Sequence, residues 1–331
     1  MSPDSRASGT GVAVIIATVG RADALELCLK SLAMQSHRPA EVTVVHSGSD
    51  KETREVCELD WPARGLTVHY QPYPHSSTAL QRDFAARRTT QPLIMFADDD
   101  VEFEADFIER LFAVLSRDAG IGAAMGRVAN HTIGEPTAVW RCYRRVVAGA
   151  GRATQPGAVI GALIPNGFPS DASEPIRAEW VGGSTTLFRR EAYLSVNGFA
   201  PHYRGSSPGE DIDLGYRISR KWQVFYVPAA RCLHHQSPSG RERISRYQFL
   251  SFRSRYGFCR ASARMSAAGA WGQMLVWAAF QAFSELSQLR RGRLPAGFGA
   301  AWAGRIEGAW SCVGWDPAAE RFPEWHDTHV A

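Results

Sequence analysis

Short runs of apolar and β-branched residues alternate with amphipathic segments in the first third of the chain, and this alternation restricts its fold more than any other feature. The run at 12–17 precedes a segment with apolar residues at helical spacing, namely Leu25, Cys28, Leu29 and Leu32. The pattern predicts further strands within 41–50, at 65–70 and at 93–97, and helices at 76–88 and 107–115. It indicates an α/β fold with a mostly parallel sheet flanked by helices, in which ligands bind beyond the carboxyl ends of the strands.

Three consecutive carboxylates, Asp98, Asp99 and Asp100, directly follow the fourth predicted strand. Two unit charges about 5 Å apart repel by roughly 3 kcal/mol at an effective dielectric constant near 20, so the cluster requires a nearby cation. Alternate residues of a loop can point to one side, and Asp98 and Asp100 would then suit a divalent ion such as Mg²⁺ or Mn²⁺. The alternative is a turn whose acids cap the next helix, but capping explains one aspartate and not three.

A second acidic cluster lies in the segment GEDIDLG at 209–215. Ser207, Pro208 and Glu210 form a capping-box pattern with proline at the first helical position, which predicts that a helix begins there. Asp211 is not needed for capping. A carboxylate beside a ligand crevice can take a proton from an attacking hydroxyl, so Asp211 is a candidate general base.

Further polar residues fall at the same predicted edge of the sheet. Thr18 and Ser47 come at the ends of the first two predicted strands, and His234 and His235 follow a later one. A histidine pair is more often structural, but a neutral imidazole at this position is also suited to be a third ligand for the ion at the aspartates.

The last quarter of the chain has a different composition. Between 241 and 264, seven arginines face one acid and are interleaved with aromatic residues, and residues 265–284 carry no charge. We expect a helical region over 241–331 whose uncharged part is buried or lies on a membrane interface. The arginines would suit anionic lipid headgroups, a lipid-linked phosphate or a donor diphosphate, although a solvated helix face is an equally good interpretation. A net charge of +4 without a nucleic-acid-binding module does not favour nucleic acid.

The N-terminal residues and the cysteines indicate the cellular compartment of the protein. Residues 1–11 are polar and resemble a flexible tail without the apolar core of a signal peptide. The six cysteines are scattered and contain no CxxC pair. Both observations predict a cytoplasmic protein, with a peripheral position at the inner face of the membrane if the C-terminal region binds lipid.

In their order, these motifs resemble those of the inverting family 2 glycosyltransferases, which have a GT-A fold, and among them the bacterial rhamnosyltransferases and enzymes of surface-polysaccharide synthesis. The segments that carry the likeness are ATVGR at 17–21, VVHSGSD at 44–50, LQRDFAARRTTQPLIMFADDDV at 80–101, WVGGSTTLF at 180–188, GEDIDLG at 209–215 and VPAARCLHH at 227–235. The resemblance covers roughly residues 12–240. It implies metal-dependent transfer of a sugar from a nucleoside diphosphate sugar to a hydroxyl of a carbohydrate or lipid-linked acceptor, with inversion at the anomeric carbon.

The resemblance also assigns roles to the positions that match the family's motifs. Metal ligands for Mn²⁺ or Mg²⁺ would be Asp98, Asp100 and His234. Asp211 would be the catalytic base, with Glu210 beside it in the acceptor site. The residues assigned to the donor are Thr18, Arg21, Ser47, Arg82 and Asp99, and those assigned to the pocket lining are Trp180, Gly182 and Gly183.

The chain departs from the family pattern at Ser47, where an aspartate usually recognises the base, and at Asp83, where an asparagine usually follows the arginine. The resemblance therefore supports a nucleoside diphosphate donor in general rather than UDP in particular. Two other classes stay open. A nucleotidyltransferase would need a glycine-rich basic loop after the first strand, which ATVGRADALE does not supply, and a non-catalytic relative would bind nucleotide sugar without turnover.

Overall fold

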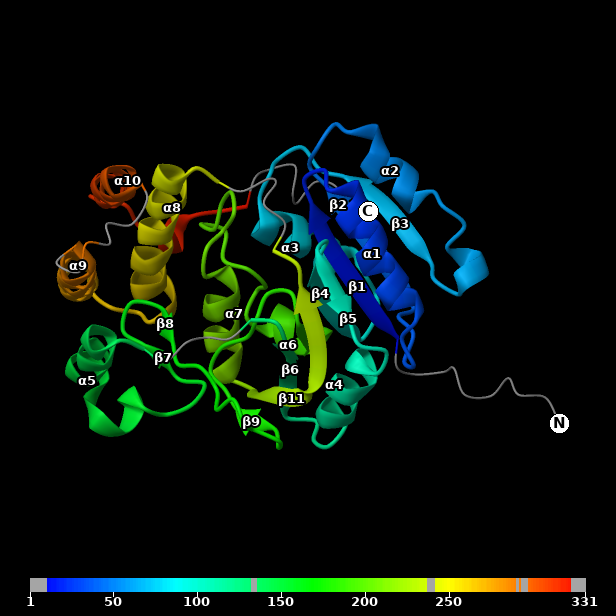
Figure 1. Cartoon of the computed structure of the whole chain (residues 1–331), viewed down its shortest axis with the longest axis horizontal. Helices are drawn as coiled ribbons and strands as arrows, with labels where there is room; N and C mark the ends of the chain where they lie inside the picture. The colour runs from blue at the N-terminus through cyan, green and yellow to red at the C-terminus, as the bar shows by residue number, and fades with distance from the viewer. Residues whose placement is uncertain (1–10, 132–135, 237–241, 290–291, 293–296, 323–331) are drawn as a thin grey trace.

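A nine-stranded sheet runs through the centre of the molecule in the computed structural model, which describes residues 11–131, 136–236, 242–289, 292 and 297–322 (Figure 1). Its strand order is β3-β2-β1-β4-β10-β6-β11-β5, with β9 paired to β11. The strands that share one direction are β1 (Val12–Thr18), β2 (Glu41–His46), β3 (Val68–Pro72), β4 (Leu93–Asp98), β6 (Ile121–Val128) and β11 (Gln223–His234). The opposed strands are β5 (Val101–Phe103), β9 (Ile176–Arg177) and β10 (Thr186–Arg189). The predicted mostly parallel α/β sheet is therefore confirmed.

Helices cover both faces of this sheet because side chains alternate between the faces along each strand. In β1, Val14 and Ile16 belong to one apolar cluster and Ile15 to the other. The helices of the first face are α1 (Ala22–Ala33) and α4 (Phe107–Leu115). Those of the second face are α3 (Thr78–Arg88), α6 (Arg190–Ser195) and α7 (Glu210–Ser219). A short helix, α2 (Lys51–Cys57), packs beside α1 near the sheet edge formed by β3.

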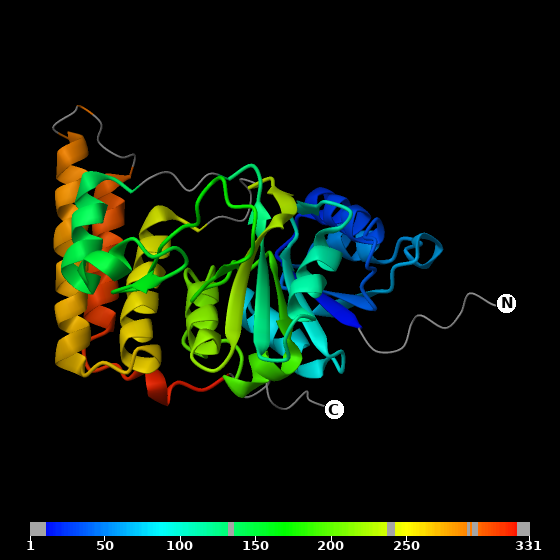
Figure 2. The same ribbon diagram turned by 90° about the horizontal axis from the view of Figure 1, so that it is seen from below.

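A group of longer helices lies beside the second face, at the end of the molecule away from β3 (Figures 1 and 2). It consists of α5 (Ala138–Ala153), α8 (Ile244–Gly257), α9 (Ala267–Leu289) and α10 (Phe298–Ser311). Phe252 and Tyr256 of α8 join the apolar cluster of that face. Helix α10 approaches α8 so closely that a Cβ at Gly304 would lie 2.0 Å from the carbonyl oxygen of Ser245, so glycine is required there. A two-stranded ribbon, β7 (Val159–Ile160) with β8 (Ile164–Pro165), lies between α5 and α7 (Figure 1).

The remaining predictions of secondary structure have mixed outcomes. Helix 107–115 is confirmed, whereas the strand expected at 65–70 begins at Val68, because Gly65 adopts a left-handed conformation and ends a short turn of helix. No element was predicted within 120–178, yet this segment contains β6 and the 16-residue helix α5, which is kinked at Gly149. The predicted tail lies almost wholly in residues 1–10, which are outside the described part of the chain. The predicted boundary near 240 also falls outside the described residues. Within the described residues, no helix is both long and apolar enough to cross a bilayer.

Candidate active site

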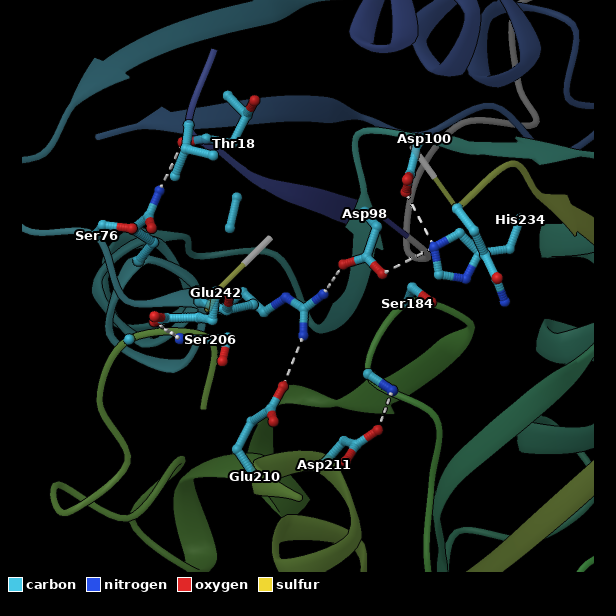
Figure 3. A pocket seen from close by; sticks show the side chains of 18 of the residues that line it. Thr18, Ser76, Asp98, Asp100, Ser184, Ser206, Glu210, Asp211, His234 and Glu242 are labelled. Carbon is cyan, nitrogen blue, oxygen red and sulfur yellow. Dashed lines mark hydrogen bonds and ion pairs between the residues drawn. The ribbon is translucent and has the colours of Figure 1, made fainter. Parts of the chain in front are cut away.

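A cavity of about 830 Å³ opens beyond the carboxyl ends of β1, β4 and β11. Parallel strands end at one edge of a sheet, so residues that are far apart in the sequence meet there. The predicted site residues that line the cavity are Thr18, Arg21, Arg82, Asp98, Asp100, Gly182, Gly183, Glu210, Asp211 and His234. Several of them are seen in Figure 3.

Two aspartates and a histidine converge on one wall of this cavity (Figure 3). Strand β5 pairs antiparallel with the end of β11 and sets Val101 opposite His234. As a result, His234 Nε2 lies 3.0 Å from Asp100 Oδ1 and 3.8 Å from Asp98 Oδ2. The hydrogen bond to Asp100 raises the pKa of His234. His235 instead pairs with Glu102 at 3.2 Å, so the register brings His234 and not its neighbour to the aspartates.

This group has the composition of a divalent-metal site. Asp98, Asp100 and His234 each offer one ligand atom, and these atoms lie within 4.8 Å of one another. Carboxylates suit Mg²⁺ and Mn²⁺, and imidazole is a common ligand of first-row transition metals, so the mixed set fits a divalent metal ion.

Asp99 points away from its neighbours and has no exposed surface. Its Oδ2 accepts hydrogen bonds from Thr18 Oγ1 at 2.5 Å and from Arg21 Nε at 3.1 Å, and Arg21 Nη1 also reaches Asp100 Oδ2 at 3.1 Å. Burial raises the pKa of Asp99 to about 6. Asp99 does not line the cavity, so the donor contact expected for it does not agree with its position. It anchors the Thr18 hydroxyl and the Arg21 fork instead.

Arg82 lies at the centre of the site and is only 1% exposed. Its Nη2 pairs with Asp98 Oδ1 at 2.5 Å, and its Nη1 with Glu210 Oε1 at 3.3 Å. Burial raises the pKa of Glu210 well above its usual range, and the arginine opposes that rise. The protein thus supplies part of the positive charge that the aspartate cluster requires.

The prediction of a capping box around Ser207 is wrong. Helix α7 begins at Glu210 after Gly209, which is left-handed with φ 87°, and Ser207 itself has φ 49°. The Ser207 hydroxyl donates to the carbonyl oxygen of Gly205 rather than capping the helix. Glu210 is therefore free of a capping role and holds Arg82.

Asp211 lies in the first turn of α7 and faces the cavity (Figure 3). Its Oδ2 accepts a hydrogen bond from the backbone N–H of Gly183 at 2.9 Å, and its Oδ1 accepts one from that of Ile212 at 2.8 Å. Burial raises the pKa of Asp211, and these two bonds oppose the rise. A side chain at Gly183 would place its Cβ 2.7 Å from Arg82 Nη1, which explains the need for glycine.

Besides Asp99, two other predicted residues lie outside this cavity. Ser47 donates a hydrogen bond to Gln81 Oε1 at 3.4 Å, and Trp180 lines an adjacent cavity of about 240 Å³ that shares Gly182 with the first. Sequence reasoning missed Gln81, whose amide donates to the carbonyl oxygens of Thr18 and Val45. It also missed the cavity residues of the C-terminal region, which are Glu242, Ile244, Tyr247 and Gln248. Gln81 adjoins the conspicuous Arg82, but no local pattern marks the other four.

Residues 9–253 match the family described as "Glycosyltransferase like family 2". The chain belongs to glycosyltransferase family 2. It is 28% identical over 287 residues to the N-acetylglucosaminyl-diphospho-decaprenol L-rhamnosyltransferase of Mycobacterium tuberculosis (strain CDC 1551 / Oshkosh), which covers 77% of this chain and 89% of that protein. The protein is thus a glycosyltransferase, as the sequence motifs predicted.

Solved structures support the fold of this glycosyltransferase. GalNAc-T7 with UDP, GalNAc and Mn²⁺ superposes with a TM-score of 0.54 and 16% identity, covering 78% of this chain and 51% of that one. The mannosyltransferase PcManGT from Pyrobaculum calidifontis, in complex with GDP-Man and Mn²⁺, gives a TM-score of 0.51 and 17% identity, covering 96% and 82%. The predicted GT-A fold is confirmed.

Proposed function

We propose that this glycosyltransferase is inverting and metal-dependent, and that it moves a sugar from a nucleoside diphosphate sugar to a hydroxyl of a lipid-linked carbohydrate acceptor. The observation that supports this most is that the Asp98, Asp100 and His234 group and the Asp211 carboxylate face one cavity. With the donor diphosphate at Asp98, Asp100 and His234 and the acceptor hydroxyl at Asp211, the anomeric carbon would lie between the leaving oxygen and the attacking oxygen.

Different residues of the chain act on the leaving group and on the attacking hydroxyl. A divalent ion at the Asp98, Asp100 and His234 group would supply neutralisation of the charge that develops on the leaving diphosphate. Arg21 borders the cavity beside Asp100 and adds fixed positive charge there. Asp211 accepts the proton of the acceptor hydroxyl, and the Gly183 N–H fixes the orientation of its carboxylate. One displacement of this kind requires no covalent nucleophile and inverts the centre.

A lipid-linked acceptor and an anionic membrane surface fit the outer helices. The mycobacterial relative is named for an acceptor that carries diphospho-decaprenol. In this chain, large apolar side chains are exposed on the outer helices, namely Leu275, Phe283, Leu286 and Leu289 of α9 and Ile306 and Trp310 of α10. Exposed arginines of α5, Arg141 and Arg145, belong to the same group of helices. An apolar surface with nearby cations matches the inner face of an anionic bilayer.

The reaction is tested by incubating the protein with a panel of UDP-, GDP- and dTDP-sugars, including dTDP-L-rhamnose, with Mn²⁺, Mg²⁺ or EDTA. We expect one donor to release nucleoside diphosphate, faster with metal than with EDTA, and the NMR coupling of the product to show the opposite anomeric configuration. Release of pyrophosphate would indicate a nucleotidyltransferase instead. Nucleotide binding with no turnover on any acceptor would favour a non-catalytic relative.

Membrane binding has its own test, co-sedimentation with phosphatidylglycerol vesicles and with phosphatidylcholine vesicles. We expect the double variant Leu275→Ser, Phe283→Ser to lose binding to the anionic vesicles. Leu59→Ser, which changes an exposed leucine far from these helices, is the matched control. Equal sedimentation of all three proteins would contradict the proposal.

A further inference from the structure

A second cavity, of about 340 Å³, lies between the outer helices and is lined by three arginines, which we call the arginine pocket. Its cationic residues come from three helices: Arg144 of α5, Arg255 of α8 and Arg305 of α10. The same helices and α9 add the aromatic side chains Trp140, Tyr247 and Trp277. Figures 1 and 2 both show these helices side by side at one end of the molecule. Its volume is within the range of about 300–1,000 Å³ that is usual for ligand sites.

The three arginines differ in their partners, and Arg255 is the one that matters here. Arg305 pairs with Glu285 through both guanidinium nitrogens, at 2.9 and 3.2 Å, and is neutralised. Arg255 donates Nη1 to the carbonyl oxygens of Ala162 and Leu163, at 2.6 and 3.2 Å, and its Nε is buried without a hydrogen-bond partner. Among the described residues, Arg255 has no carboxylate within ion-pair distance, and burial lowers its pKa. A half-buried cation without a counter-ion is costly, and an anionic ligand would relieve that cost.

The arginine pocket shares a wall with the active-site cavity. Tyr247 and Gln248, in the first half of α8, line both cavities. One molecule can therefore place a sugar in the active site and an attached anionic group among the arginines. A guanidinium group can bind two phosphate oxygens at once. The Trp277 ring lies 5.0 Å from the Arg255 guanidinium, so an apolar surface adjoins the cationic one.

We propose that the arginine pocket binds the diphosphate of the acceptor, so that the acceptor is a glycosyl diphosphate joined to an apolar chain. The inference rests on the proposed glycosyl transfer and names its acceptor class. The diphosphate lies against Arg144 and Arg255, and the first part of the apolar chain contacts Trp140, Ile164 and Trp277.

Calorimetric titration with inorganic pyrophosphate in EDTA tests the site, because EDTA removes binding bridged by metal at the aspartates. We expect the wild-type protein to bind pyrophosphate and Arg255→Gln to bind it at least about tenfold more weakly, since a charge-assisted bond is lost. Arg246→Gln, on the exposed side of the same helix, is the matched control and should bind like the wild type. No binding by the wild type, or equal affinities of Arg255→Gln and wild type, would overturn the proposal.

A second variant and two further measurements distinguish the acceptor site from misfolding of the variant, from binding of free pyrophosphate alone and from failure of the proposed function. If Arg255→Gln does not fold, as judged by circular dichroism, Arg144→Gln replaces it with the same expected loss. Geranylgeranyl diphosphate should bind more tightly than inorganic pyrophosphate, and equal affinity would refute the lipid-linked source. Binding of nucleoside diphosphate with Mn²⁺ should be unchanged in Arg255→Gln. If the wild-type protein does not bind nucleoside diphosphate with Mn²⁺, the proposed function fails. If the wild-type protein binds that nucleotide but not pyrophosphate, only the acceptor site is refuted.

Discussion

The replacement Asp211→Asn gives the sharpest test of the proposed chemistry, because it removes a base with almost no change of shape. General-base catalysis contributes about 10²- to 10⁴-fold in rate, which corresponds to roughly 3–5 kcal/mol of barrier. We therefore expect kcat to fall by about that factor. The affinity for nucleoside diphosphate with Mn²⁺ should change less than about twofold, because Asp211 lies apart from the Asp98, Asp100 and His234 group.

The structure also sets the expected effect of this replacement on stability. Both oxygens of Asp211 accept backbone hydrogen bonds, from Gly183 and from Ile212. An asparagine can replace one acceptor, but its amide group would face the other N–H, which costs about 1–3 kcal/mol. Removal of a charge whose pKa is raised by burial offsets part of that cost. The fold should persist, with a melting temperature a few degrees lower.

The assay is release of nucleoside diphosphate at saturating donor and acceptor, with nucleotide affinity measured by calorimetry. Asp23→Asn makes the same exchange at an exposed position in the first turn of α1 and serves as the control. If Asp211→Asn turns over within about threefold of the wild type while Asp23→Asn is unchanged, Asp211 is not the base. A parallel loss of nucleotide binding would show instead that the residue acts by holding the site together.

Four further predictions follow from the site and its surroundings. Asp100→Asn should weaken nucleotide binding at least about tenfold in Mn²⁺ but not in EDTA, as calorimetry can show; an equal change in both would contradict metal ligation. Arg82→Met should lower the free energy of unfolding in urea by about 3 kcal/mol, because it removes the guanidinium partner of the buried Glu210 and of the half-buried Asp98. A loss no larger than that of Arg246→Met would be inconsistent with this. Burial raises the pKa of Asp211, so the acid limb of kcat/KM should lie above the ordinary aspartate value of about 3.9, and a limb at or below that value argues against its role as base. Burial lowers the pKa of His202 from 6.5 to about 4, so between these pH values the unfolded state binds a proton that the folded state does not. The free energy of unfolding should therefore fall by about 3 kcal/mol as the pH drops from 6.5 to 4. His202→Leu should lack this part of the pH dependence, and a curve of unfolding free energy against pH that matches the wild type would refute the assignment.

Much of the fold and part of the site could be read from local patterns. Strands and helices follow from the spacing of apolar residues over a few positions, and parallel strands bring their carboxyl ends together whatever their neighbours are. That was enough to predict the α/β sheet and to place Thr18 and Asp98 at one edge of it. The helix at 138–153 was not predicted, because the segment around it is rich in glycine, proline and alanine.

Other features of the site could not be predicted because they depend on contacts between residues far apart in the chain. The sequence showed that the aspartates need a cation, but only the folded chain determines that Arg82 reaches Asp98 and Glu210 while Arg21 reaches Asp99 and Asp100. Likewise, the capping pattern at Ser207 does not form a cap, because Ser207 is left-handed and its hydroxyl donates to the carbonyl oxygen of Gly205.

The sequence by itself therefore determined the family, the sheet and the acidic residues at its edge, because these are properties of short segments and their order. The tertiary structure decided which histidine joins the aspartates, since that depends on the pairing of β5 with β11. It also decided that arginines from three helices gather beside the active site. Both outcomes arise from strand register and helix packing, which set distances between residues that no local pattern relates.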